Sequence, residues 1–218
     1  MLDTRFPRPL GDIGHPDSFG VAVRHAVVRG AWPSEVVIAV QALRAGGLGE
    51  AFAREARELE RQGALAITTS CGFLVLLQRE LQNAVGVPVV TSSLLQLPEL
   101  LAREQQVGVL TISAKHLGAE HLMAAGVAPA RLDDVIVQGV DPDGEFASAI
   151  LGNRETMDLG KACGDVVGAA LALKSCSPGL RTVVLECTNM PPYAQAVRDA
   201  TGFELRSLLD APQLLPRA

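Results

Sequence analysis

Short runs of valine, isoleucine and leucine alternate along the chain with longer segments in which apolar residues recur at helical spacing. A short continuous apolar run is typical of a strand buried on both faces, and alternation with helices predicts a parallel sheet. The predicted strands are Ala64–Thr69, Val87–Val90, Val107–Thr111, Val135–Gln138, Thr182–Leu185 and Phe203–Arg206. Val21–Val28 is predicted as a further strand with looser patterning. The pattern therefore predicts an α/β fold.

The clearest predicted helix is Leu48–Gln62, where Leu48, Phe52, Ala56 and Leu59 form one apolar stripe among charged residues. Further helices are predicted at Ser34–Arg44, Gly72–Ala84, Lys115–Ala125, Asp158–Leu173 and Pro192–Ala200. By contrast, Pro7–Phe19 is rich in glycine and proline, which predicts an irregular loop.

Two parts of the chain share one spacing of glycines around a cysteine. Gly63 lies eight residues before Cys71 and Gly86 lies fifteen after it, and glycines stand at the same two distances from Cys187. Each unit contains a turn glycine, a buried strand, the cysteine, a helix and a second glycine. This correspondence predicts two lobes related by a pseudo-twofold axis.

Cys71 and Cys187 each follow an apolar strand and precede a predicted helix. Ligands of open α/β sheets bind at the carboxyl ends of the strands. The start of a helix offers unpaired backbone N–H groups that hold carboxylates, and its field lowers the pKa of a thiol. Small or polar residues flank both cysteines, namely Ser70, Gly72, Thr188 and Asn189.

Two opposed thiols suit the inversion of a carbon stereocentre, because one removes a proton from one face and the other returns a proton to the opposite face. The pair would titrate as a coupled unit. The other cysteines, Cys163 within a predicted helix and Cys176 in a predicted turn, are interpreted as structural. Glu186, directly before Cys187, either tunes that thiol or is a structural residue at a strand end.

Composition narrows the possible functions. Of 218 residues 48% are apolar and 20% charged, the net charge is −5, and no basic stripe suggests nucleic acid as a partner. No apolar run approaches the roughly 18–20 residues of a membrane span, and no secretory signal is recognised, so a cytoplasmic protein with free thiols is expected. The cysteines and histidines show no metal-ligand spacing, so no metal site is expected.

Three motifs resemble the aspartate/glutamate racemase superfamily, which includes amino-acid and hydantoin racemases, maleate isomerases and arylmalonate decarboxylases. They are Thr69–Gly72, Val107–Thr111 and Leu185–Pro191, and the opening Met1–Gly14 resembles a racemase-like bacterial subgroup. The resemblance covers nearly the whole chain. It implies two Rossmann-like lobes with parallel sheets and the active site between them, no pyridoxal phosphate or metal cofactor, and a homodimer. Lobe 1 is expected to comprise residues 1–95 and 206–218, and lobe 2 residues 96–205.

The resemblance also implies roles for individual residues. Cys71 and Cys187 would transfer the protons. The substrate-binding residues are expected to be Asp12, Ser70, Gly72, Phe73, Thr111, Ser113, Thr188 and Asn189. The substrate is expected to be a small chiral amino acid or related carboxylate, and the activity a cofactor-independent racemase or epimerase.

The chain departs from the family pattern beside both cysteines. Gly72 and Phe73 stand where many members have Asn-Thr, and Asn189 stands where glutamate and aspartate enzymes more often carry histidine or a carboxylate. The substrate therefore need not be glutamate or aspartate. Three alternatives stay open: a decarboxylase or cis–trans isomerase of the same superfamily, an intracellular carboxylate sensor without catalytic activity, and a dithiol redox protein.

Overall fold

The computed structural model of the protein describes residues 1–38 and 47–214. The predicted helix Ser34–Arg44 lies partly outside these residues, and within them α1 covers Pro33–Ile38. The last four residues of the predicted first lobe, 215–218, also lie outside.

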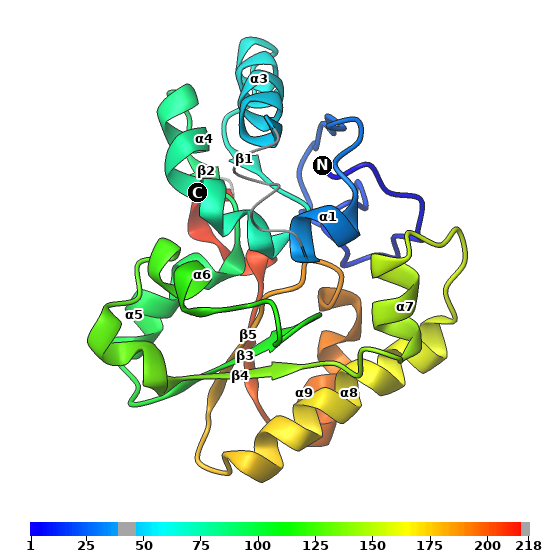
Figure 1. Ribbon diagram of the computed structural model, residues 1–218, viewed down its shortest axis with the longest axis vertical. Coiled ribbons are helices and arrows are strands. Elements are labelled where there is room, and N and C mark those ends of the chain that lie inside the picture. The colour runs from blue at the N-terminus through cyan, green and yellow to red at the C-terminus, as the bar shows by residue number, and fades with distance from the viewer. Residues whose placement is uncertain (39–46, 215–218) are drawn as a thin grey trace.

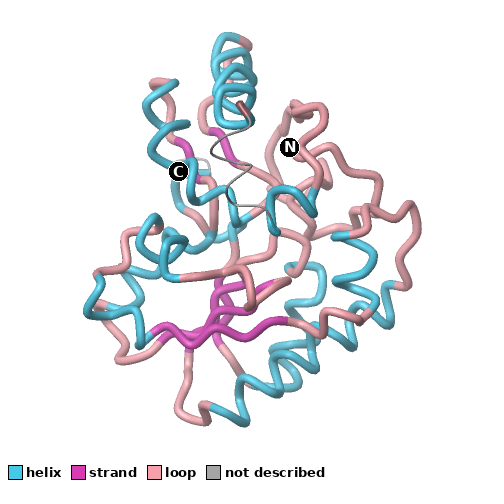
Figure 2. Tube along the Cα trace, in the orientation of Figure 1, coloured by secondary structure: helices cyan, strands magenta, loops and turns pink. Residues whose placement is uncertain are grey.

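The described strands form two separate parallel sheets. Their bounds are Ile67–Thr68 (β1), Val89–Val90 (β2), Val107–Thr111 (β3), Val135–Gly139 (β4), Thr182–Leu185 (β5) and Glu204–Arg206 (β6). β1 pairs with β2, and the larger sheet has the order β4-β3-β5-β6. Figure 2 shows the two short strands apart from the larger sheet. The predicted α/β class with parallel sheets is confirmed, whereas the pseudo-twofold relation and the lobe boundaries stay predictions.

All six principal strand predictions correspond to observed strands, and β3 and β5 have the predicted bounds. The prediction of a strand at Val21–Val28 is wrong, because that segment is irregular. It contacts the first residues through isolated backbone bonds such as Val28 N–H to the Met1 carbonyl at 2.9 Å. Val21 and Val27 are 38% and 40% exposed, so the segment lacks the buried face that would support a strand.

The helices surround these sheets. Those after α1 are Leu48–Arg61 (α3), Gln78–Ala84 (α4), Leu97–Leu101 (α5), Ala119–Ala124 (α6), Glu145–Leu151 (α7), Leu159–Cys176 (α8) and Ala194–Thr201 (α9). Figure 1 shows α3 and α4 beside β1 and β2 in the upper part, and α8 and α9 beside the larger sheet below. α5 and α7 were not predicted. Cys176, predicted in a turn, is the last residue of α8.

Three of the predicted helices differ in detail. The predicted Gly72–Ala84 helix is a 3-10 helix at Gly72–Leu77 (η1) followed by α4. The prediction Pro192–Ala200 likewise corresponds to a short 3-10 helix, Pro191–Tyr193 (η4), and α9. α6 begins four residues later than predicted, after Gly118, whose extended backbone cannot continue a helix.

The core is centred on β3, whose five residues are all buried between β4 and β5. A Cβ atom on Gly108 would crowd the side chains of Val183 and Leu173, so glycine lets β5 and α8 pack closely on β3. Asp158 caps α8 by accepting the backbone N–H groups of Gly160 and Lys161. This packing fixes the end of β5, where Cys187 follows. None of the described helices combines the length and apolar character that a membrane crossing requires.

Candidate functional site

Cys71 and Cys187 line the same small cavity. Both are free thiols, 8% and 6% exposed. Cys71 follows β1 of the smaller sheet and Cys187 follows β5 of the larger one. The fold therefore brings the two cysteines, far apart in the sequence, to one cavity.

The backbone at Cys71 is extended and turns directly into η1. Ser70, just before it, accepts a hydrogen bond from the Leu2 N–H at 3.0 Å through its Oγ. Thr69 donates to the Thr91 carbonyl at 2.7 Å. These bonds tie the first motif to the N-terminal segment and to the end of β2, and so hold the thiol in place.

The second motif is bonded directly to the first. The Thr188 hydroxyl donates to the Ser70 carbonyl at 2.8 Å. Cys187 Sγ donates to Asn189 Oδ1 at 3.5 Å, and Asn189 Nδ2 donates to Asp12 Oδ2 at 2.6 Å. The carboxamide of Asn189 is thereby oriented by Asp12 on one side and contacts the thiol on the other.

The predicted substrate-binding residues fall into two groups. Ser70, Gly72, Phe73, Thr188 and Asn189 line the cavity together with both cysteines. Asp12, Thr111 and Ser113 do not line it.

Each of the three residues outside the lining has a partner. Asp12 lies behind Asn189, and its other oxygen accepts bonds from Arg8 at 2.6 Å and from the Gly14 N–H at 2.7 Å. Thr111 donates to Glu186 at 2.7 Å. Ser113 contacts His116 Nδ1 at 2.8 Å.

The remaining lining is apolar except for Glu186. It comprises Leu2, Phe6, Pro33, Val37, Ile112 and Ile150. Nothing in the sequence marks these residues as part of the site, because their contact with the cysteines depends on how distant segments pack. The cavity therefore places apolar side chains beside two thiols and a carboxyl group.

The comparison with solved structures identifies the fold. Arylmalonate decarboxylase matches with a TM-score of 0.50 at 16% identity, over 73% of this chain and 70% of that chain. A glutamate racemase isoform from Bacillus anthracis also matches at a TM-score of 0.50, with 17% identity over 78% of this chain and 64% of its own. The chain has the fold of the aspartate/glutamate racemase superfamily. No family model matches the sequence.

Curated sequences similar to this chain carry a lyase name. "Dimethylsulfoniopropionate lyase" of Durusdinium sp. clade D is 26% identical over 97% of this chain and 74% of its own length. "Dimethylsulfoniopropionate lyase 3" of Emiliania huxleyi is 31% identical, again over 97% of this chain. The chain spans 59% of the length of that second relative.

In this racemase-superfamily fold the ionisation of the thiols is governed by burial. Burial, and then the charge of Glu186, raises the pKa of Cys71 to about 12, although the backbone N–H groups of Phe73 and Leu74 act in the opposite direction. The same two causes raise the pKa of Cys187 well above its usual value. Here a single backbone N–H group, that of Asn189, acts in the opposite direction. Cys71, with two opposing amides, is the better placed of the two to become a thiolate.

Glu186 is the ionisable residue for which the sequence allows two roles, tuning of the Cys187 thiol or a structural role at the end of a strand. It is 1% exposed and lines the cavity beside both cysteines. Burial raises its pKa to about 7, against a lowering by the Thr111 hydrogen bond. The available signal was a charged residue directly after an apolar strand and directly before a cysteine.

Glu186 is expected to make stability depend on pH. Its pKa rises from its ordinary value of 4.5 to about 7 on folding, so its contribution to stability is fully favourable below pH 4.5 and is lost as the pH rises to 7. At 1.36 kcal/mol per pKa unit the loss is about 3 kcal/mol. Denaturant unfolding is measured at pH 5 and pH 8. At pH 8 the free energy of unfolding of Glu186→Gln should exceed that of the native sequence by about that amount. An equal effect of the substitution at both pH values would contradict the assignment.

Proposed function

We propose that the protein is a lyase that removes the α-proton of a small carboxylate and expels a leaving group from the β-carbon, with dimethylsulfoniopropionate or a close analogue as substrate. The observation that supports this most directly is the placement of two buried free thiols on one largely apolar cavity, Cys71 directly before η1 and Cys187 in the turn after β5. The two named lyases, similar over 97% of the chain, support the substrate class.

The proposed reaction requires one base and no oxidant. The Cys71 thiolate takes a proton from the carbon next to the carboxylate. The electron pair left on that carbon forms the carbon–carbon double bond as the carbon–sulfur bond breaks, and the pair of that bond leaves with sulfur. The products are dimethyl sulfide, acrylate and, once the thiol ionises again, one proton.

Two features of the site suit this reaction. The backbone N–H groups of Phe73 and Leu74 offset part of the rise in the pKa of Cys71 that burial and Glu186 cause, which favours Cys71 over Cys187 as the base. Apolar residues such as Phe6, Ile112 and Ile150 line the space in which a neutral dimethyl sulfide would form. The positive charge of the sulfonium group disappears when sulfur leaves as dimethyl sulfide. An apolar lining favours this neutral product over the charged group.

The proposal is tested by adding dimethylsulfoniopropionate to the whole chain and measuring dimethyl sulfide in the headspace by gas chromatography, with acrylate followed by NMR. Equal amounts of both products are expected. The absence of both products at any pH between 6 and 9 would exclude this lyase activity.

Racemisation is the second candidate, because elimination needs one thiol whereas the cavity holds two. Removal and return of the α-proton on opposite faces would use both Cys71 and Cys187. Incubation of chiral amino and hydroxy acids in D2O separates the candidates: a racemase incorporates deuterium at the α-carbon and loses optical rotation without any elimination product.

A further inference from the structure

One oxygen of the Glu186 carboxyl group has no hydrogen-bond partner among the described residues. Its Oε2 accepts the Thr111 hydroxyl at 2.7 Å, but its Oε1 is buried and unpaired. An ionised oxygen left unpaired away from water is costly. Because Glu186 lines the cavity, a ligand in that cavity can supply the missing partner.

The position of Oε1 depends on the first cysteine motif. A Cβ atom on Gly72 would overlap Glu186 Oε1 and the Glu186 backbone carbonyl. The absence of a side chain at Gly72 therefore lets the carboxyl group lie against the backbone at the start of η1. Oε1 therefore lies beside the first cysteine motif, on the cavity that both thiols line.

The charges around Glu186 favour its neutral form once an anion enters. Facing it are the Thr111 hydroxyl from the end of β3, Cys71 from the start of η1 and Cys187 from its own segment, and each thiol would be negative if ionised. Farther away, the charge of Asp12 is paired with Arg8 at 2.6 Å. Tyr193, from η4, is a neutral phenol whose pKa is raised to about 12, chiefly by burial. No described cation pairs with Glu186, so a carboxylate ligand would add like charge and draw a proton onto it.

We propose that Glu186 is protonated whenever a small carboxylate occupies the cavity, and that its Oε1–H donates a hydrogen bond to a carboxylate oxygen of that ligand. This inference rests on the proposed function only in taking a small carboxylate as the ligand. When the α-proton is removed, negative charge moves onto the carboxylate oxygens, and the same hydrogen bond strengthens. Glu186 keeps its proton throughout, so it is a catalytic residue that stabilises charge and is not a base.

The experiment measures propionate binding to the whole chain by isothermal titration calorimetry between pH 5.5 and pH 9, in pairs of buffers with different ionisation enthalpies. Propionate has the carboxylate but no leaving group, and propionamide is the neutral control. Above pH 7 the native protein is expected to take up close to one proton per propionate, and the Kd should rise about tenfold per pH unit. Below pH 6 the Kd should be constant, and propionamide binding should take up no proton.

Two variants separate this role from a structural one. Glu186→Gln keeps a hydrogen-bond donor, so it should bind propionate with less than a twofold change in Kd over the same range and with no proton uptake. Thr111→Val keeps the carboxyl group but removes the hydrogen bond that favours its ionised form, so the onset of proton uptake should move to higher pH.

Proton uptake that persists in Glu186→Gln, or its absence in the native protein, would overturn the inference. Dimethyl sulfide release combined with propionate binding that takes up no proton would overturn it and leave the proposed function standing. Proton-linked propionate binding without release of dimethyl sulfide would support the inference and contradict the lyase activity. A failure of propionate to bind at any pH would overturn the inference, and release of dimethyl sulfide would then still decide the proposed function.

Discussion

Replacing Cys71 with serine is expected to lower dimethyl sulfide release at pH 8 by about 10³-fold, within the range of about 10²–10⁴ typical of a lost general base. A serine hydroxyl is a far weaker acid than a thiol, so the N–H groups of Phe73 and Leu74 would no longer stabilise an ionised base. The measurement is the initial rate of dimethyl sulfide formation by gas chromatography. Folding is checked by the unfolding midpoint of each variant.

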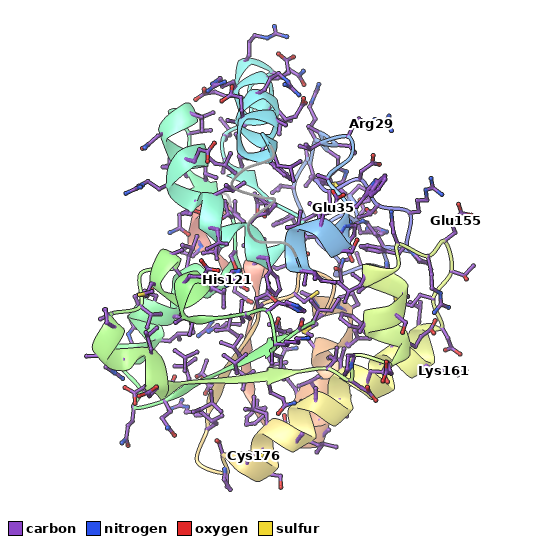
Figure 3. The ribbon with its side chains drawn as sticks, viewed as in Figure 1. Arg29, Glu35, His121, Glu155, Lys161 and Cys176 are labelled. Carbon is purple, nitrogen blue, oxygen red and sulfur yellow. The ribbon has the colours of Figure 1, made fainter. Side chains whose placement is uncertain are left out.

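Cys187→Ser distinguishes the two candidate reactions. If the protein is a lyase with Cys71 as its base, Cys187→Ser should retain elimination within about tenfold, because no proton is returned to the opposite face. If the protein is a racemase, Cys71→Ser and Cys187→Ser should each abolish interconversion of the two enantiomers. Cys176→Ser is the matched control, since this thiol is exposed at the outer end of α8, as Figure 3 shows. Elimination that survives in Cys71→Ser and disappears in Cys187→Ser would reverse the assignment of the base.

Gly72→Ala is expected to lose about 3 kcal/mol of stability, the upper part of the range for overpacking, together with most activity. The added Cβ would overlap both the carboxyl group and the backbone carbonyl of Glu186. That backbone cannot retreat easily, because the Glu186 N–H is bonded to the Leu110 carbonyl at 2.8 Å at the end of β3. The first cysteine motif would move away from the second, and the cavity would change shape.

The matched control for Gly72→Ala is Gly168→Ala. Gly168 is exposed within α8, and a Cβ atom there would meet no other atom within 4 Å. Alanine in a helix interior should stabilise the protein by roughly 0.5–1 kcal/mol. Chemical denaturation of both variants, with dimethyl sulfide release measured alongside, tests the contrast. A Gly72→Ala protein as stable and active as the native one would show that Glu186 can move without consequence.

The local pattern of apolar and polar residues was sufficient to predict most of the helices and strands. β3 and β5 have the predicted bounds because each is one continuous run of buried apolar residues, and the ends of that run mark the ends of the strand. α3 matches because its apolar stripe and its charged face differ so clearly. Val21–Val28 was predicted wrongly because its apolar residues have no sheet to join, and a strand needs a partner that local sequence does not supply.

The candidate site was predicted in part. Seven of the ten predicted site residues line the cavity, because they lie next to the cysteines in sequence and share their strand-to-helix junctions. Asp12, Thr111 and Ser113 are held by other side chains outside that lining. The distant apolar residues, such as Leu2 and Ile150, could not be found, because nothing near them in the sequence marks them as neighbours of the thiols.

For the two cysteines, the sequence determined some features and the tertiary structure determined others. By itself the sequence determined the α/β class, the two strand-to-helix junctions and the thiol at each, because these depend on residue type and short-range spacing. The tertiary structure alone decided that both thiols share one cavity, that apolar residues from distant segments enclose it, and that Glu186 lies buried with one free oxygen beside Gly72. The physical reason is that burial and the pKa values that follow from it depend on atoms brought together by packing, and no local pattern specifies those atoms.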